Sequence, residues 1–536
     1  MKLSTFRQLV QWVFFLLFLL LFFLTTYPFA LQLPVRLFLQ SDPLMAVVAM
    51  IAGRAFISTM LLGLGVLVLS LIVGRLFCGY VCPLGTLNDL MGRFVVGKKG
   101  RKEGPEPRPG RGIKYFILAG VLAAALLGAD LLHFFSPLAI TPRFFTLVFF
   151  PVVTGVLSAS FDLLIPFFTW AGLDALSVMS WQRFYFTGAL SSLLLMGFIL
   201  GAVFWQRRFW CSTLCPAGAL LGLASRTALF RRVTNADACN HCGRCANVCD
   251  MRAITSDFVN TVPGECTLCG DCVSVCNKGA VRLAFAAPRT FADTIEGSER
   301  RWFLLSAGAG LAAASLLKAA PQNKNNLQGA LIRPPGSLPE SDFLARCARC
   351  GACMKSCKTN GLQPCGLEAG LDGLWTPRLV SRIGGCEEKC NMCGYACPTQ
   401  AIRALPLEEK RFVKIGTGVI DRSRCIAWEQ DRLCLICDEI CPYDAIEFRN
   451  LENAGTKMNR PVVLANKCTG CGLCETRCPI AGRSAIEVYS IGEERKTHGS
   501  YVTDEKRRLR EVKSAPAFGI PGEGGEDEGV PEGFSR

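Results

Sequence analysis

Apolar runs of bilayer length dominate the first part of the chain and alternate with short polar loops. A membrane-spanning helix needs about 20 predominantly apolar residues. Four runs meet this length, and they predict spans at Val10–Leu31, Phe56–Phe77, Lys114–Phe135 and Phe184–Trp205. We therefore expect an α-helical membrane bundle over residues 1–235.

A fifth apolar region, Phe144–Trp170, is interrupted by Pro151, Asp162 and Pro166. Proline inside a helix removes a backbone donor and kinks or breaks the helix. Three arrangements fit this pattern: a re-entrant hairpin, an interfacial pair of short helices, or two further spans.

Positive charge gathers beside the apolar runs. Seven basic residues lie between Arg93 and Arg111, and five more lie between Arg207 and Arg232. Cytoplasmic loops of membrane proteins carry such an excess, so both segments should face the cytoplasm of a multi-pass protein of the bacterial inner membrane. The net charge of +15 then reflects membrane topology, and nucleic-acid binding is disfavoured.

The rest of the chain predicts soluble modules. Small α+β ferredoxin-like domains are expected at residues 236–290 and 340–490, and residues 514–536 form a Gly-, Pro- and Glu-rich tail of the kind that stays disordered. Between the modules, residues 298–320 place Arg300 and Arg301 before Trp302-Phe303-Leu304 and a weakly apolar run. This order is typical of a twin-arginine export signal or anchor, which would export the C-terminal domain. The alternative is a linker or a surface helix.

Cysteine is the outlier of the composition, with 29 residues. Most belong to the bacterial ferredoxin run C-x2-C-x2-C-x3-C, which wraps an iron–sulfur cubane. Six quartets occur, two of them with a longer first gap, and they predict six [4Fe–4S] clusters as cofactors. The quartets are Cys239, Cys242, Cys245 and Cys249; Cys266, Cys269, Cys272 and Cys276; Cys347, Cys350, Cys353 and Cys357; Cys386, Cys390, Cys393 and Cys397; Cys425, Cys434, Cys437 and Cys441; and Cys468, Cys471, Cys474 and Cys478.

In two-cluster ferredoxins the fourth cysteine of each run serves the other cluster. By this crossed rule Cys276 completes the cluster of the first quartet, and Cys249 completes that of the second. Gly243 and Gly270 lie inside the loops, where the backbone needs positive φ.

Other metal chemistry fits less well. Structural zinc takes four ligands from two knuckles, without repeated triplets and a trailing fourth cysteine. Haem lacks ligands, because only three histidines occur and no C-x-x-C-H motif is present.

Two further cysteine pairs lie at the ends of predicted spans. Cys78 and Cys82 end the second run, Cys211 and Cys215 follow the fourth, and each pair is followed by proline. The four thiols ligate one more metal centre if they meet in space, and otherwise they are reduced structural pairs. Cys365 is left over, as a free thiol or an alternative ligand.

The chain resembles two families joined end to end. Residues 1–290 resemble NapH-type membrane ferredoxins, through the two Cys-x3-Cys-Pro motifs followed by two ferredoxin quartets. The part from Glu299 onward resembles NapG-type exported polyferredoxins, through the Arg-Arg segment, Arg333-Pro334-Pro335-Gly336, Phe343-Leu344-Ala345-Arg346-Cys347 and Cys425-Ile426-Ala427-Trp428.

This resemblance implies a quinol-oxidising module that feeds electrons to an exported redox partner, a reductase or a cytochrome. It also implies nested pairing in the exported domain, in which the first quartet exchanges its fourth cysteine with the fourth quartet and the second with the third. Asp130, His133 and Arg143, at the outer end of the third predicted span, are candidates for a quinone site, and the alternative is that they lie in a solvated loop.

No catalytic side chain is expected, because a series of cubanes conducts electrons without bond chemistry of its own. Two other functions remain open at this stage. One is a maturation or regulatory ferredoxin that reduces a partner's cofactor, and the other is a cytoplasm-facing ferredoxin that docks a soluble dehydrogenase.

Overall fold

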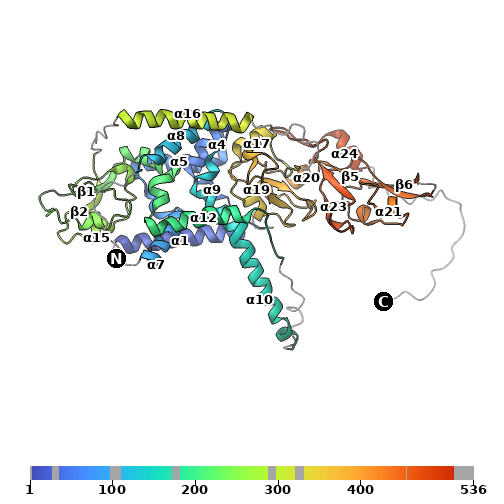
Figure 1. Cartoon of the computed structure of the whole chain (residues 1–536), viewed down its shortest axis with the longest axis horizontal. Coiled ribbons are helices and arrows are strands. Elements are labelled where there is room, and N and C mark those ends of the chain that lie inside the picture. Colours follow the sequence, from blue (N-terminus) through green and yellow to red (C-terminus); the bar gives the residue numbers. More distant parts are fainter. Residues whose placement is uncertain are drawn as a thin grey trace.

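The computed structural model describes residues 3–26, 36–96, 110–170, 172, 182–287, 297–319, 331–453 and 456–511. Three parts follow one another along the long axis (Figure 1): a small unit around β1, β2 and α15, a helical bundle, and a larger unit that runs from α17 to α24. The bundle lies between the two cysteine-rich units. The predicted tail at 514–536 lies outside the described residues.

The bundle and the helices attached to it are formed mainly by the first half of the chain. They are α1 (Leu3–Leu24), α3 (Leu37–Gln40), α4 (Pro43–Ala52), η1 (Ser58–Met60), α5 (Leu61–Val73), α6 (Leu76–Tyr80), α7 (Pro83–Val96), α8 (Ile113–Leu126), η2 (Leu132–Phe134), α9 (Pro137–Phe144), η3 (Phe145–Phe149), α10 (Phe150–Trp170), α12 (Ala189–Trp205), η4 (Trp210–Leu214), α13 (Pro216–Ala224), η5 (Ser225–Thr227) and α16 (Gly297–Ala319).

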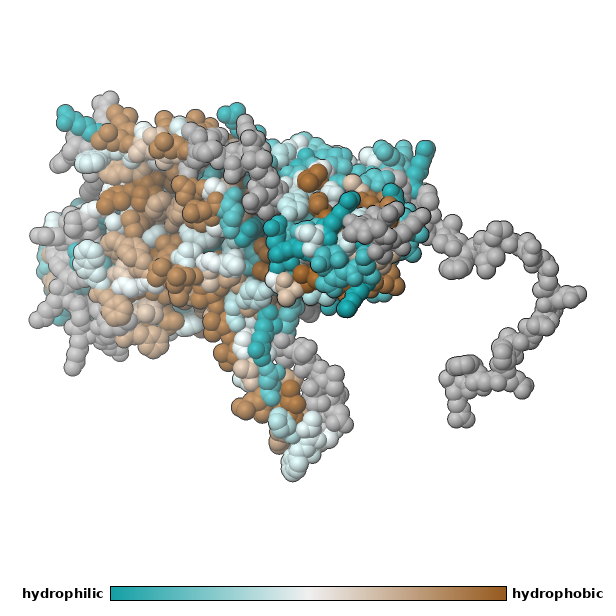
Figure 2. Space-filling view, turned by 45° about the vertical axis from the view of Figure 1, so that its right-hand side comes forward, coloured by the Kyte–Doolittle hydropathy of each residue, from teal (hydrophilic) through white to brown (hydrophobic). Residues whose placement is uncertain are grey.

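Each of the four predicted spans contains a helix. Helix α1 begins at Leu3 and so lies further toward the N-terminus than predicted, whereas α5, α8 and α12 are shorter than the predicted ranges. By length and composition, two helices of the described chain are able to cross a membrane, Leu3–Leu24 and Pro137–Trp170, and α4, α5, α8, α12 and part of α16 are shorter apolar helices. Hydrophobic side chains gather over the bundle, whereas the C-terminal unit is largely hydrophilic (Figure 2).

The fifth apolar region is neither a hairpin nor a pair of spans. Residues Pro137–Trp170 form one continuous helix, and its π-helical turn η3 directly precedes Pro151. A widened turn accommodates a residue that cannot donate its backbone hydrogen bond, which explains why Pro151 does not break the helix. The C-terminal part, α10, projects from the side of the molecule (Figures 1 and 2).

Helix α4 was not predicted, although the sequence carries its start signal. Asp42 is the N-cap, and its carboxylate accepts hydrogen bonds from the backbone N–H groups of Leu44 and Met45, while Pro43 occupies the first turn. Aspartate followed by proline is a favoured helix start. The helix lies at the centre of the bundle, where Leu44 and Met45 are completely buried.

Helix α16, which carries the paired arginines, packs along α8 at very short range. A Cβ atom placed on Gly310 would come within 2.2 Å of the Gly120 carbonyl oxygen. One turn further on, Ala124 and Ala314 are fully buried in a common cluster. Small residues four apart on both helices let parallel backbones approach closely, an arrangement common between helices in membranes.

The smaller unit is built on one antiparallel pair, β1 (Phe230–Thr234) with β2 (Val281–Phe285). Its loops carry α14 (Arg244–Asn247), η6 (Pro263–Glu265) and α15 (Asp271–Ser274). It docks on the bundle end that bears α6 and α7.

The larger unit has three antiparallel pairs, β3 with β4, β5 with β8 and β6 with β7. Its elements are α17 (Glu340–Arg346), α18 (Ala352–Lys355), β3 (Leu362–Pro364), η7 (Leu371–Gly373), β4 (Pro377–Leu379), α19 (Met392–Ala396), α20 (Leu407–Lys410), β5 (Thr417–Ile420), α21 (Ile426–Glu429), α22 (Ile436–Glu439), β6 (Ile446–Asn453), β7 (Thr456–Val463), α23 (Leu473–Arg477), β8 (Ile486–Tyr489) and α24 (Asp504–Glu511). The fully buried Tyr501 packs in its core, so this unit extends past the predicted boundary at residue 490.

Candidate functional site

The regular quartets share one loop conformation. A glycine with positive φ follows the second cysteine in four of them: Gly243, Gly270, Gly351 and Gly472. Each of these glycines is the N-cap of the short helix that carries the third cysteine. Positive φ is accessible to glycine without strain, so the expectation for Gly243 and Gly270 is confirmed. The quartet beginning at Cys386 lacks this glycine and has Asn391 in its place.

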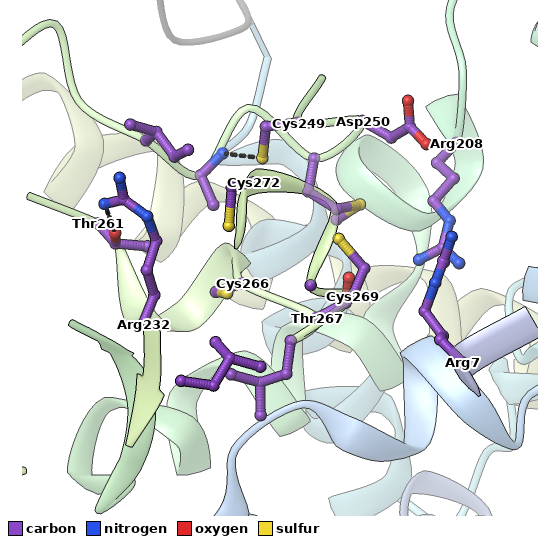
Figure 3. A pocket seen from close by; sticks show the side chains of 16 residues that line it. Arg7, Arg208, Arg232, Cys249, Asp250, Thr261, Cys266, Thr267, Cys269 and Cys272 are labelled. Atoms are coloured by element: carbon purple, nitrogen blue, oxygen red, sulfur yellow. Dashed lines mark hydrogen bonds between the residues drawn. The ribbon is translucent and has the colours of Figure 1, made fainter. Parts of the chain in front are cut away.

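The crossed arrangement of the first module is visible in a cavity of about 510 Å³. Cys266, Cys269 and Cys272 line it together with Cys249 from the other quartet (Figure 3). The backbone N–H of Ala253 donates to the Cys249 sulfur at 3.3 Å. In the partner quartet, Cys239 and Cys245 are electrostatic neighbours. The structure thus brings Cys249 to the second quartet, as the crossed rule predicts.

In the larger unit, two cavities of about 410 Å³ each are lined by three cysteines of one quartet and the fourth cysteine of a neighbouring quartet. One contains Cys386, Cys390, Cys393 and Cys357. The other contains Cys425, Cys434, Cys437 and Cys478. Their like ligand sets fit two copies of the same group.

The remaining two sets complete the pattern. Cys397 is an electrostatic neighbour of Cys347, Cys350 and Cys353. Cys441 occupies the same position beside Cys468, Cys471 and Cys474.

The nested pairing is therefore wrong: the first quartet exchanges with the second, and the third with the fourth. The reason is local, because α18 packs against α19 and α22 against α23. Each short helix thereby delivers its trailing cysteine to the adjacent loop.

The chemistry of these sets fits cubanes. Among the residues that the structure describes, no three His, Cys, Asp or Glu side chains lie close enough to hold a single metal ion. Burial raises the pKa of Cys266 to about 11, and burial with the Cys350 and Cys347 thiols raises the pKa of Cys353 well above its ordinary value. Such thiols become thiolates when a metal displaces their protons.

The two Cys-x3-Cys-Pro motifs meet at one end of the bundle. The electrostatic neighbours of Cys82 are Cys211, Cys78 and Cys215. All four thiols lie near the start of a helix, and the Cys215 sulfur accepts the backbone N–H of Gly218 at 3.3 Å. The sequence alone left this meeting open.

The motifs are longer than the prediction recognised, because each reads Arg-x2-Cys-x3-Cys-Pro-x-Gly. Arg75 and Arg208 are the matching arginines, and both are buried. Arg75 is an electrostatic neighbour of Cys78 and Cys215. This repeat can be read from the sequence, and it indicates that the two motifs form equivalent halves of one site.

Buried ion pairs and loop contacts hold the smaller unit against the bundle end that bears the two Cys-x3-Cys-Pro motifs. Glu265 binds Lys114 at 2.6 Å and Arg75 at 3.3 Å, and all three side chains are buried. The Tyr80 hydroxyl donates to the carbonyl of Leu268 at 2.9 Å. Leu268 lies between Cys266 and Cys269, so a cluster loop abuts the Cys78–Cys82 segment directly.

At the opposite end, the three predicted quinone-site candidates lie together. Arg349, from the loop between Cys347 and Cys350, binds the Asp130 carboxylate at 3.3 Å and the His133 Nδ1 atom at 2.7 Å. Arg143 donates to the His133 carbonyl at 3.1 Å. Arg349 was missed by the sequence analysis because the partner quartet is more than 200 residues away in the chain.

Cys365 stands apart from the cluster sets. It is buried, and the Arg333 guanidinium donates to its sulfur at 3.6 Å. Thr376 and Arg378 are further neighbours of this thiol. Cys365 lines neither of the two cysteine-lined cavities of the larger unit. The choice between a free thiol and an alternative ligand stays a prediction.

Comparison with known proteins agrees with these sites. A model described as "4Fe-4S binding domain" matches residues 55–102 and 187–235, the two segments that hold the Cys-x3-Cys-Pro motifs. A model described as "4Fe-4S dicluster domain" matches residues 432–481, which hold the last three cysteines of the third quartet and the whole fourth quartet of the larger unit. The protein is thus an iron–sulfur electron-transfer protein of the ferredoxin type.

Three relatives show which ferredoxin-type proteins this chain is similar to. The methylamine utilization ferredoxin-type protein MauM of Methylorubrum extorquens is 36% identical over 34% of this chain and 83% of its own length. The ferredoxin-type protein NapG of Escherichia coli is 32% identical over 36% of this chain and 86% of its own length. The putative electron transport protein YccM of Escherichia coli is 31% identical, with 46% of its length covered. The chain belongs to the MauM/NapG family of ferredoxin-type proteins.

Proposed function

We propose that this protein is a membrane-anchored conduit that passes electrons from the quinol pool to an exported redox protein. The observation that carries the proposal is the position of the apolar bundle between the two cysteine-rich units (Figure 1). A bilayer around the bundle leaves the smaller unit on one side and the larger unit on the other.

Helix α1 sets the distance between the two units. Near its start, Arg7 pairs with Asp271 of the smaller unit at 3.5 Å. At its end, the carbonyls of Phe23 and Thr25 accept from Lys355 of the larger unit, each at 3.3 Å. Its 22 residues extend about 33 Å at 1.5 Å per residue, close to the ~30 Å hydrocarbon thickness of a bilayer.

The orientation follows from charge. Arg111 donates to the Met251 carbonyl of the smaller unit, and Arg207 pairs with Asp250 of that unit at 3.6 Å. Both arginines belong to the basic segments, so the positive-inside rule favours a cytoplasmic position for the smaller unit. Helix α16 then carries the chain across, and its exposed residues Trp302, Leu304 and Leu316 suit a lipid-facing surface. On this reading α16 is an export signal retained as an anchor, and the chain unites NapH-like and NapG-like parts.

We propose that the protein holds seven clusters. The six ferredoxin sets hold one cubane each, and Cys78, Cys82, Cys211 and Cys215 hold a seventh centre. When bound, each cubane accepts and releases one electron, with a potential set by neighbouring charge, hydrogen bonds and burial. The chain supplies the thiolates, the buried arginines beside them, and a dry core.

Two experiments test the proposal. In spheroplasts, a protease added outside should remove a C-terminal epitope tag and spare a tag inserted at residues 98–102, in the basic loop; protection of both tags refutes export. In addition, a quinol analogue added anaerobically to the purified protein should bleach its visible cluster absorbance, and an unchanged spectrum refutes quinol oxidation.

A further inference from the structure

The border between the bundle and the larger unit encloses a group of buried polar side chains next to a cluster loop. His133 and Arg143 come from the bundle, and Arg349 comes from the Cys347–Cys350 loop. His133 and Arg143 are each only 1% exposed. The charges on this border are not balanced internally, since Arg349 has the Asp130 and Asp372 carboxylates while Arg143 forms no ion pair with any described residue.

The hydrogen bonds fix the tautomer of His133. Its Nδ1 atom lies 2.7 Å from Nη1 of Arg349. A guanidinium group only donates, so Nδ1 accepts and the ring proton sits on Nε2. That Nε2 atom is fully buried and has no hydrogen-bond partner among the described residues. A buried donor without an acceptor destabilises the folded protein, so an acceptor from outside the chain is expected at this atom.

Arg143 presents further unmet donors beside it. Its Nη1 atom donates to the His133 carbonyl, but Nε and Nη2 are buried without a partner in the described chain. The guanidinium carbon lies 3.8 Å from the ring centroid of Trp375, and the His133 and Trp375 rings are 6.0 Å apart. The Arg143 guanidinium therefore covers one face of Trp375, and its unmet donors need oxygen acceptors beside that ring.

From these contacts we infer that His133 and Arg143 bind the carbonyl or hydroxyl oxygens of a quinone headgroup, against Trp375. Planar aromatic surface and hydrogen-bond donors match the two features of that headgroup. A lipid-soluble molecule also suits the surroundings: Trp375 donates to the Ser191 hydroxyl at 2.9 Å, and the adjacent Leu190 is an exposed apolar residue, 66% accessible. The inference rests on the proposed quinol function and gives it a location.

The site lies against the cluster set of Cys347, Cys350, Cys353 and Cys397. Arg143 is an electrostatic neighbour of Cys350. A Cβ atom on Gly351 would lie 3.2 Å from Cβ of Thr146, so the cluster loop touches the helix that carries Arg143. Electrons released here would enter the larger unit directly, without crossing the bundle.

The test uses the full-length protein and an azido-benzoquinone photolabel. Labelled peptides should map to residues 131–146 and to the Trp375 segment, and a short-chain quinone should quench tryptophan fluorescence saturably. His133→Phe should weaken that binding about five- to tenfold, as expected for one lost hydrogen bond. His133→Gln should largely restore it, because its amide can accept from Arg349 and donate to the quinone. His498→Phe, at an exposed histidine, is the matched control.

The possible results distinguish a failure of this quinone site from a failure of the proposed function. Bleaching of the clusters by quinol with labelling elsewhere, or with unchanged affinity in His133→Phe, overturns the site and leaves the function standing. Displacement of the label by an anionic phospholipid but not by quinone shows a lipid headgroup site and also overturns it. Absence of bleaching in the wild-type protein defeats the proposed function itself.

Discussion

The seventh centre makes a prediction that iron analysis can decide. Cys78, Cys82, Cys211 and Cys215 are mutual electrostatic neighbours at one bundle end. Replacing Cys211 and Cys215 together by alanine removes half of their thiols while leaving every ferredoxin quartet intact. Cys365→Ala is the matched control, because it removes a buried thiol that lies outside all of these sets.

The magnitude follows from the ligand count. Of the 29 cysteines, 28 fall into seven sets of four. At four irons per cubane, the anaerobically purified protein should contain about 28 irons and about as many acid-labile sulfides per chain, and the double variant about 24. The difference is one part in seven, so chain concentration is best determined by amino-acid analysis.

Two results would refute this reasoning. A wild-type content of about 24 irons, unchanged in the double variant, means that the four thiols hold no cubane. About one zinc per chain that disappears in the double variant means a mononuclear site. The control must retain the full iron content, since its loss would show that any buried cysteine is needed for assembly.

Other predictions follow from single contacts. Cys397→Ala should alter the electron paramagnetic resonance spectrum of one cluster in the larger unit and leave unchanged the cluster whose fourth ligand is Cys478. Loss of the Cys478 cluster instead would show that the nested pairing is right. Gly310→Leu should displace α16 from α8 and make α16 accessible to protease, and an unchanged digestion pattern contradicts the packing. Glu265→Ala leaves two buried cations unpaired and should cost about 3–5 kcal/mol of stability, seen as a lower thermal midpoint, whereas Glu447→Ala at an exposed pair should cost less than about 1 kcal/mol.

Local spacing was enough to find the cluster loops. The interval between cysteines indicates which three thiols face one cubane, and glycines with positive φ mark four of the six loops. The crossed exchange in the smaller unit was also predictable, since its two quartets are neighbours in the chain. The start of helix α4 at Asp42-Pro43 was also predictable from the sequence. The helix has ten residues, which are too few for a membrane span.

Pairing within the larger unit was not readable from spacing. With four quartets, Cys357 has three possible recipients, and the choice depends on which short helices pack together. The resemblance suggested the wrong recipient, while the α18–α19 contact delivers Cys357 to the set of Cys386. Likewise, nothing in the sequence places Arg349 beside His133, because that contact joins segments 216 residues apart.

The buried arginines link cluster loading to the docking of the smaller unit. Four thiolates around a cubane of charge +2 leave a net charge of −2 in a dry site, and such charge requires compensation. Arg75 lies beside Cys78 and Cys215, and Arg208 lies beside Cys211. Arg75 also holds Glu265 of the ferredoxin unit at 3.3 Å.

A seventh centre at these thiols would therefore share the Arg75 guanidinium with the neighbouring cluster loop. Without that centre, Arg75 retains the Gly264 carbonyl and the Glu265 carboxylate. Because Lys114 shares this carboxylate, the interface would carry excess positive charge. Undocking would let water reach these cations and relieve that excess. On the proposed function, assembly of the bundle centre should consequently strengthen the contact between the Cys78–Cys82 segment and the Cys266 loop.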